Sequence, residues 1–87
     1  MSRFDAMQHF IRVADLGSFA AAADQLGVAR SVVTRRIAAL EEHLGVKLIT
    51  RTTRKLTLTS AGVVYLERCR RILQAIDDAE SEVMASS

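Results

Sequence analysis

The feature that most constrains the fold is a corner centred on Gly27, between two segments with helical spacing. The segment before it, 19–26, contains four consecutive alanines, and side chains this small let a second helix cross closely over it. Gly27 can adopt the positive φ that ends a helix, and Val28 can then return to the core. The segment after it, about 30–43, carries an apolar stripe at helical spacing made of Val33, Ile37, Leu40 and Leu44. This combination predicts a helix-turn-helix.

Positive charge is concentrated in the middle of the chain. The 87 residues carry a formal charge of only +2, but residues 30–55 hold five Arg and two Lys against two Glu, which gives +5. Two Arg against three Asp make residues 1–29 slightly acidic, and three Arg against five acids do the same for residues 56–87. A basic segment between acidic ones favours a polyanionic partner that one face of the protein contacts.

The helix expected at about 30–43 has a polar and basic outer face. The side chains opposite its apolar stripe are Ser31, Arg35, Ala38 and Glu42, with Thr34 and Arg36 on the flanks. An α-helix fits the major groove of B-DNA, where Arg can bond guanine and Ser or Thr can reach a phosphate or a base edge. The alternative is that the arginines only solvate an exposed helix face.

A basic hairpin is predicted directly after this helix. Residues 46–50 and 56–58 have extended character, and the RTTR sequence at 51–54 forms a polar turn between them. This arrangement is typical of the wing of a winged helix. Arginines at its tip, together with Lys55, can contact phosphates or enter a narrow minor groove. An ordinary basic hairpin is the alternative.

The last helix is expected to run from about Ser60 to Ala85, with Thr59 as its cap. This length exceeds what so small a domain needs. A seam with coiled-coil spacing is formed by Tyr65, Cys69, Ile72, Ile76, Ala79 and Val83, with Leu66 and Leu73 in a second stripe. We expect one stripe to cover the helix's own domain and the seam to pair with a second chain. Cys69 is interpreted as a small seam or core residue.

These segments combine into one mainly α fold. A helix at 4–16 has a broad apolar face and ends at Gly17, and Ser18 can cap the helix that follows. Residues 1–58 then form a winged helix-turn-helix of three helices and a short two-stranded wing. Residues 59–87 form the linker and dimerisation helix.

No group of residues suited to catalysis or metal binding stands out. His9 and His43 are far apart, and Cys69 is the single cysteine. Paired carboxylates, metal-ligand spacing and a phosphate loop are missing, and Glu41 and Glu42 are interpreted as surface charge. We therefore expect no enzyme activity, metal site, cofactor or membrane partner. Two alternatives to specific DNA binding are a winged helix that binds protein and a non-specific architectural DNA binder.

Two stretches carry motifs in a fixed order, VADLGSFAAAADQLGV and TRRIAALEEHLGVKLITRTTRKLTLTSAG. The second contains the pattern L-x-x-R-T-x-R-x-x-x-L-T-x-A-G in Leu48, Arg51, Thr52, Arg54, Leu58, Thr59, Ala61 and Gly62. On these motifs nearly the whole chain resembles the N-terminal DNA-binding domain, with linker helix, of a LysR-type transcriptional regulator.

The resemblance implies a bacterial, cytoplasmic regulator that is nucleoid-associated when bound to DNA. It also implies a homodimer, joined through the linker helix, on an interrupted palindromic operator in double-stranded DNA, and allows a tetramer of the full-length protein. An effector-binding C-terminal domain would lie outside these 87 residues, so we expect an excised domain without a cofactor of its own.

The contacts that the resemblance carries over are Arg30, Ser31, Thr34 and Arg35 for the groove, Arg51, Thr53 and Arg54 for the wing, and Arg36 for a phosphate. Three residues depart from the family pattern. Ala29 stands where the family usually has a capping Ser, a loss of about 1 kcal/mol. Arg30 stands where it has Gln, which suits adenine, whereas Arg suits guanine or a phosphate. Ile49 replaces a common Phe and is interpreted as a packing change.

Overall fold

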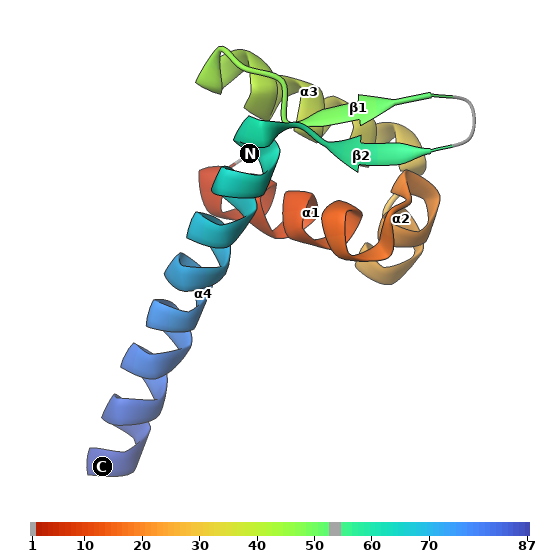
Figure 1. Cartoon of the computed structure of the whole chain (residues 1–87). Coiled ribbons are helices and arrows are strands. Elements are labelled where there is room, and N and C mark those ends of the chain that lie inside the picture. Colours follow the sequence, from red (N-terminus) through yellow and green to blue (C-terminus); the bar gives the residue numbers. More distant parts are fainter. Residues whose placement is uncertain (1, 53–54) are drawn as a thin grey trace.

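The computed structural model describes residues 2–52 and 55–87, and it has the predicted order of elements (Figure 1). Four helices and a two-stranded sheet are present: α1 (Arg3–Leu16), α2 (Phe19–Leu26), α3 (Arg30–Leu44), β1 (Ile49–Arg51), β2 (Leu56–Leu58) and α4 (Ser60–Ser86). The mainly α winged helix-turn-helix followed by a long helix is therefore confirmed.

The predicted helix ends are set by local chemistry. The Ser18 hydroxyl accepts a hydrogen bond from the Ala21 N–H (3.1 Å), so it caps α2 as expected. Gly27 ends α2 at φ 70°, in the left-handed region, and the following Val28 packs against the core. The cap of α3 is Ala29, which offers no side-chain hydrogen bond. The structure therefore confirms that α3 has no side-chain cap, as the sequence predicted.

Helices α1, α2 and α3 enclose the core, with Phe10, Val13 and Val33 fully buried. Ala22 and Ala23 are also buried, so the alanine run provides the close approach of α2 that the sequence predicted. Leu44 is the exception in the predicted α3 stripe. It is 39% exposed because it lies in the last turn of the helix, just before Gly45 ends it.

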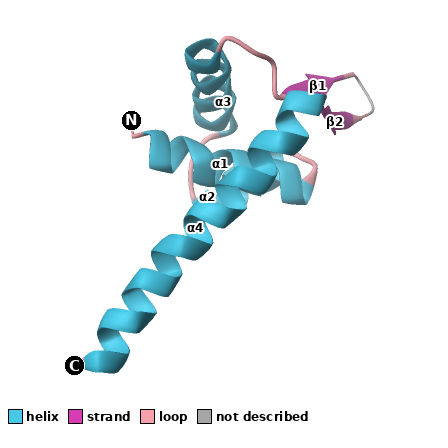
Figure 2. Cartoon of the chain, turned by 60° about the vertical axis from the view of Figure 1, so that its left-hand side comes forward, coloured by secondary structure: helices cyan, strands magenta, loops and turns pink. Residues whose placement is uncertain are grey.

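Helix α4 packs on the core with its first turns and then extends alone away from it (Figures 1 and 2). Tyr65 stacks at a tilt on Phe10, with ring centroids 5.5 Å apart. Cys69 is fully buried in the core of its own chain, so it offers no surface to a partner helix. This corrects the expected seam, because Cys69 serves the domain core instead. The outer residues Ile72, Ile76 and Val83 are exposed.

The wing is an antiparallel pair in the register Ile49↔Leu58, Thr50↔Thr57 and Arg51↔Leu56. Beyond the strands, the Thr52 N–H donates to the Lys55 carbonyl (2.9 Å). The predicted contact residues Thr53 and Arg54 lie outside the described residues. No helix in the described part of the chain is long and apolar enough to cross a membrane.

Candidate nucleic-acid interface

The outer face of α3 carries exposed arginines, as the sequence predicted. Arg30, Ser31 and Arg35 are exposed, and half-buried Thr34 donates its hydroxyl proton to the Arg30 carbonyl (3.1 Å). Within residues 2–52 and 55–87, no carboxylate pairs with either of these two arginines. Their positive charge is therefore available to an anionic partner.

Arg36 lies on another side of α3. Its Nη1 atom is 2.5 Å from Nε2 of His9, a residue of α1 that is 7% exposed. Nδ1 of the same ring is 2.6 Å from the Asp5 carbonyl, so the ring is assigned as donating from Nδ1 and accepting from Arg36 at Nε2. The structure thus ties Arg36 to α1 and separates it from the Arg35 face. Its role as a phosphate contact stays a prediction.

Arg51 connects the wing with the helix-turn-helix. Its guanidinium carbon lies 4.3 Å from the centroid of the Phe19 ring, at the start of α2. The two side chains border two adjoining hollows, of about 250 and 240 Å³. Arg30 and Lys55 line the first hollow, and Thr34 is among the residues that line the second. Of the predicted contact residues, Arg30, Thr34 and Arg51 therefore line the groove between α3 and the wing, while Ser31 and Arg35 are exposed on α3.

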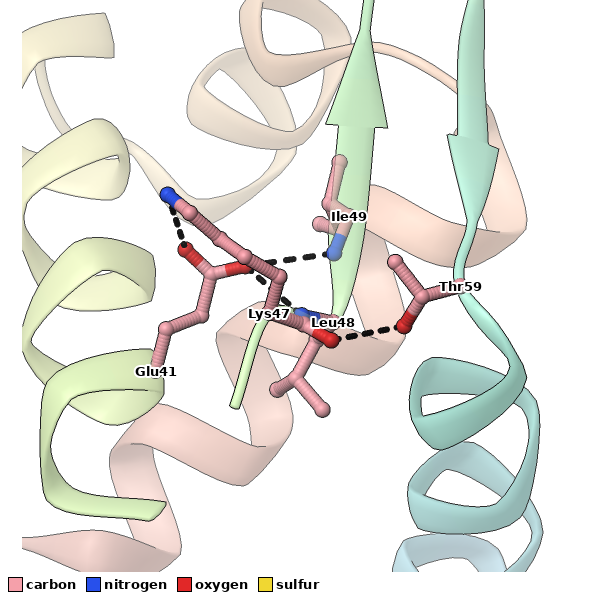
Figure 3. A network of polar contacts seen from close by, with 5 residues as sticks. All are labelled: Glu41, Lys47, Leu48, Ile49 and Thr59. Atoms are coloured by element: carbon pink, nitrogen blue, oxygen red, sulfur yellow. Dashed lines mark hydrogen bonds and ion pairs between the residues drawn. The ribbon is translucent and has the colours of Figure 1, made fainter. Parts of the chain in front are cut away.

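Glu41 is the residue whose role the sequence interpretation missed. Its carboxylate accepts hydrogen bonds from the Leu48 N–H (2.7 Å) and the Ile49 N–H (3.2 Å), as Figure 3 shows. The Lys47 ammonium lies 3.6 Å from its other oxygen, and the Glu41 side chain is only 11% exposed. The reading of Glu41 as surface charge was wrong. Glu41 connects α3 to the start of β1, because the chain turns at Gly45 and brings Leu48 and Ile49 to this carboxylate.

Thr59 fastens the same segment to α4. Its hydroxyl donates to the Lys47 carbonyl (2.6 Å), as Figure 3 shows. The same hydroxyl accepts from the Gly62 N–H (3.0 Å), which is the predicted cap. A Cβ atom on Gly62 would collide with the Leu48 carbonyl oxygen, so only glycine lets α4 begin this close to β1. The wing, α3 and α4 are therefore joined at one point.

Two ionisable side chains of α4, half-buried Tyr65 and buried Cys69, are suited to packing. Burial raises the pKa of the Tyr65 hydroxyl to about 12 and also raises the pKa of the Cys69 thiol. A thiol held in its neutral form is a poor nucleophile, which supports the core role of Cys69. Among the described residues, no group of three His, Cys, Asp or Glu could hold a metal ion.

Comparison with known proteins agrees with this geometry. Residues 4–63 match the model of the bacterial regulatory helix-turn-helix proteins of the lysR family. The HTH-type transcriptional repressor PA14_22550 of Pseudomonas aeruginosa (strain UCBPP-PA14) is 47% identical over 81 residues, which cover 93% of this chain and 26% of that protein. The regulator CrgA of Neisseria meningitidis (serogroup B strain MC58) is 50% identical over 76 residues, 87% of this chain and 25% of CrgA.

A solved structure shares the whole architecture. The crystal structure of the CbnR_DBD–DNA complex superposes with a TM-score of 0.89 at 40% identity, covering 98% of both chains. The chain spans about a quarter of the length of the two regulators. The family match covers more than half of the chain and agrees with the fold. The chain therefore belongs to the lysR family of bacterial regulatory helix-turn-helix proteins.

Proposed function

We propose that the chain binds double-stranded DNA specifically, with α3 in the major groove and the wing on the flanking backbone or minor groove. The observation that carries the proposal is the groove between α3 and the wing, which Arg30 and Arg51 line, together with Arg35 exposed on α3. An α-helix fits the major groove, and arginines that form no ion pair within residues 2–52 and 55–87 suit guanine and phosphate. The CbnR_DBD structure, which shares this architecture, is a complex with DNA and supports DNA as the partner.

We further propose that α4 pairs two copies of the chain. Ile72, Ile76 and Val83 are exposed on α4 at coiled-coil spacing, and a second α4 would cover them. The first half of α4 holds three Arg against one Glu, whereas residues 74–87 hold four acids and no Arg or Lys. These charges favour an antiparallel pair, since each basic half then faces an acidic half. Such a pair has two reading faces, which suits an interrupted palindrome.

The wider context also belongs to the proposal. We infer a bacterial cytoplasmic transcriptional regulator, whose effector domain would follow the 59–87 helix and whose full-length form could assemble into tetramers. We propose a DNA-binding unit at 1–58 and a dimerisation helix at 59–87, in which the first turns of α4 pack on the core and its later turns, which extend away from the core, make the dimer contact. We propose no cofactor for this part of the chain.

Arg30 is proposed to shift base preference away from the family norm. It is exposed at the first turn of α3, where the family usually has Gln. A guanidinium suits guanine O6 and N7, whereas an amide suits adenine. Selection from randomised duplexes with the parent and with Arg30→Gln measures this difference. An unchanged preference at every position would exclude Arg30 as a base-reading residue.

Arg35→Ala tests the binding mode, with Arg12→Ala as the matched control. Arg12 is an exposed arginine on α1, so both variants lose one positive charge. Fluorescence anisotropy with a selected duplex should show a loss of about fivefold or more for Arg35→Ala and less than about twofold for Arg12→Ala. Equal losses would contradict the assigned face. Equal affinity for selected and random duplexes at matched salt would favour an architectural binder, and no DNA binding would favour a protein-binding winged helix.

A further inference from the structure

Arg51 and Phe19 form a contact across the groove between the wing and α2. Arg51 is the last residue of β1 and is exposed, whereas Phe19 is the first residue of α2 and is 6% exposed. The guanidinium carbon lies 4.3 Å from the ring centroid, well within the range of a cation–π contact. The ring is held by the core, so it is the rigid partner of the pair.

The contact with Phe19 is made by the face of the Arg51 guanidinium and not by its N–H donors. A guanidinium that lies over a ring uses its π face, while its N–H donors point outward in the guanidinium plane. In the described part of the chain, no carboxylate forms an ion pair with Arg51. Its donors can therefore meet a phosphate without first leaving another anion.

Stacking also restricts where Arg51 can go. An arginine that is not held in place samples many rotamers, and fixing it in a DNA contact costs conformational entropy. Phe19 and Arg51 border both hollows between the helix-turn-helix and the wing, one next to Arg30 and the other next to Thr34. The ring thus holds the guanidinium close to α3, where a bound duplex would pass.

We propose that Phe19 is a positioning residue for a phosphate contact of Arg51. Phe19 does not touch DNA; it holds the Arg51 guanidinium over the groove in the free protein, with its donors directed to solvent. The inference rests on the proposed DNA binding and adds a second residue, from the core side of α2, to the binding machinery of the wing.

A double-mutant cycle on DNA affinity tests the coupling. Phe19→Leu keeps an apolar side chain but removes the ring, and should weaken binding of a selected duplex about two- to fivefold. Arg51→Ala should weaken it more, and the double variant should bind as Arg51→Ala does. Phe19→Tyr keeps the ring and should restore binding to within about twofold of the parent. Losses that add in the double variant, or no loss in Phe19→Leu, would overturn the proposal.

A second measurement needs no substitution in the core. In the NMR spectrum of the free parent protein, ring current should shift the Arg51 side-chain resonances upfield, because the guanidinium lies over the Phe19 ring. Unshifted resonances would show that the guanidinium is not held there and would overturn the proposal even if Phe19→Leu does not fold. Loss of DNA binding in Arg35→Ala together with additive effects at Phe19 and Arg51 would reject the positioning role alone. The absence of DNA binding by the parent would instead reject the proposed function.

Discussion

Replacing Glu41 by Ala should destabilise the domain far more than a surface carboxylate would. The Glu41 carboxylate accepts two backbone hydrogen bonds, from Leu48 and Ile49, at the point where α3 meets β1. Leu48 is 1% exposed and Ile49 9%, so water reaches their N–H groups poorly once the carboxylate is gone. Each orphaned N–H then costs about 1–3 kcal/mol.

The magnitude follows from these contacts. Two N–H groups that lose a charged acceptor cost together about 3 kcal/mol, with some relief from water that enters the space. The ion pair with Lys47 adds little, because that side chain is 79% exposed and such pairs contribute about 0–1 kcal/mol. A loss of about 3 kcal/mol in so small a domain lowers the Tm by about 12 °C or more. Glu41→Gln keeps a neutral acceptor and should lose about half as much.

Urea unfolding followed by circular dichroism measures these differences, with Glu42→Ala as the matched control. Glu42 is the exposed neighbour on the same helix, and its loss should change the free energy of unfolding by no more than about 0.5 kcal/mol. If Glu41→Ala and Glu42→Ala were equally stable, Glu41 would be a surface charge and the joint between α3 and β1 would have another basis.

Three further substitutions test other parts of the fold. Gly62→Ala should cost about 2 kcal/mol or more and weaken the attachment of α4, because the new methyl group collides with the Leu48 carbonyl; a neutral effect on urea unfolding would contradict the close packing. Ala29→Ser should stabilise by about 1 kcal/mol by supplying the missing cap of α3, and an unchanged urea midpoint would show that no cap bond forms. Burial raises the pKa of Tyr65 from 10.0 to about 12, so the unfolded chain loses this proton at lower pH than the folded protein does. The contribution of Tyr65 to the free energy of unfolding is therefore fully present below pH 10 and is lost between pH 10 and 12. Tyr65→Phe should flatten that decline, and an unchanged decline would assign it to other groups.

The elements could be predicted because their signals are local. Helical periodicity, the Ser18 and Thr59 caps and the glycine at position 27 act within a few residues, so the sequence alone places α1 to α4 closely. The outward face of α3 could also be predicted, because helical periodicity determines which side chains lie opposite the buried stripe. Opposite the buried stripe of Val33, Ile37 and Leu40, the remaining side chains face outward.

The contacts between elements could not be read from the sequence. Periodicity shows that α4 has apolar stripes, but not which stripe covers its own domain, and so Cys69 was placed in the seam although the core encloses it. Glu41, Arg36 and Phe19 each act through a partner on another element, β1, α1 and the wing respectively. Their roles depend on how the helices dock, which no single segment encodes.

Selection of bound duplexes from a random library, followed by footprinting, tests the central claim most directly. A dimer that presents two α3 helices should enrich two inverted half-sites about one helical turn apart, with protection over both. Enrichment of a single half-site, or protection without any enriched sequence, would contradict the account of a dimeric, sequence-reading winged helix.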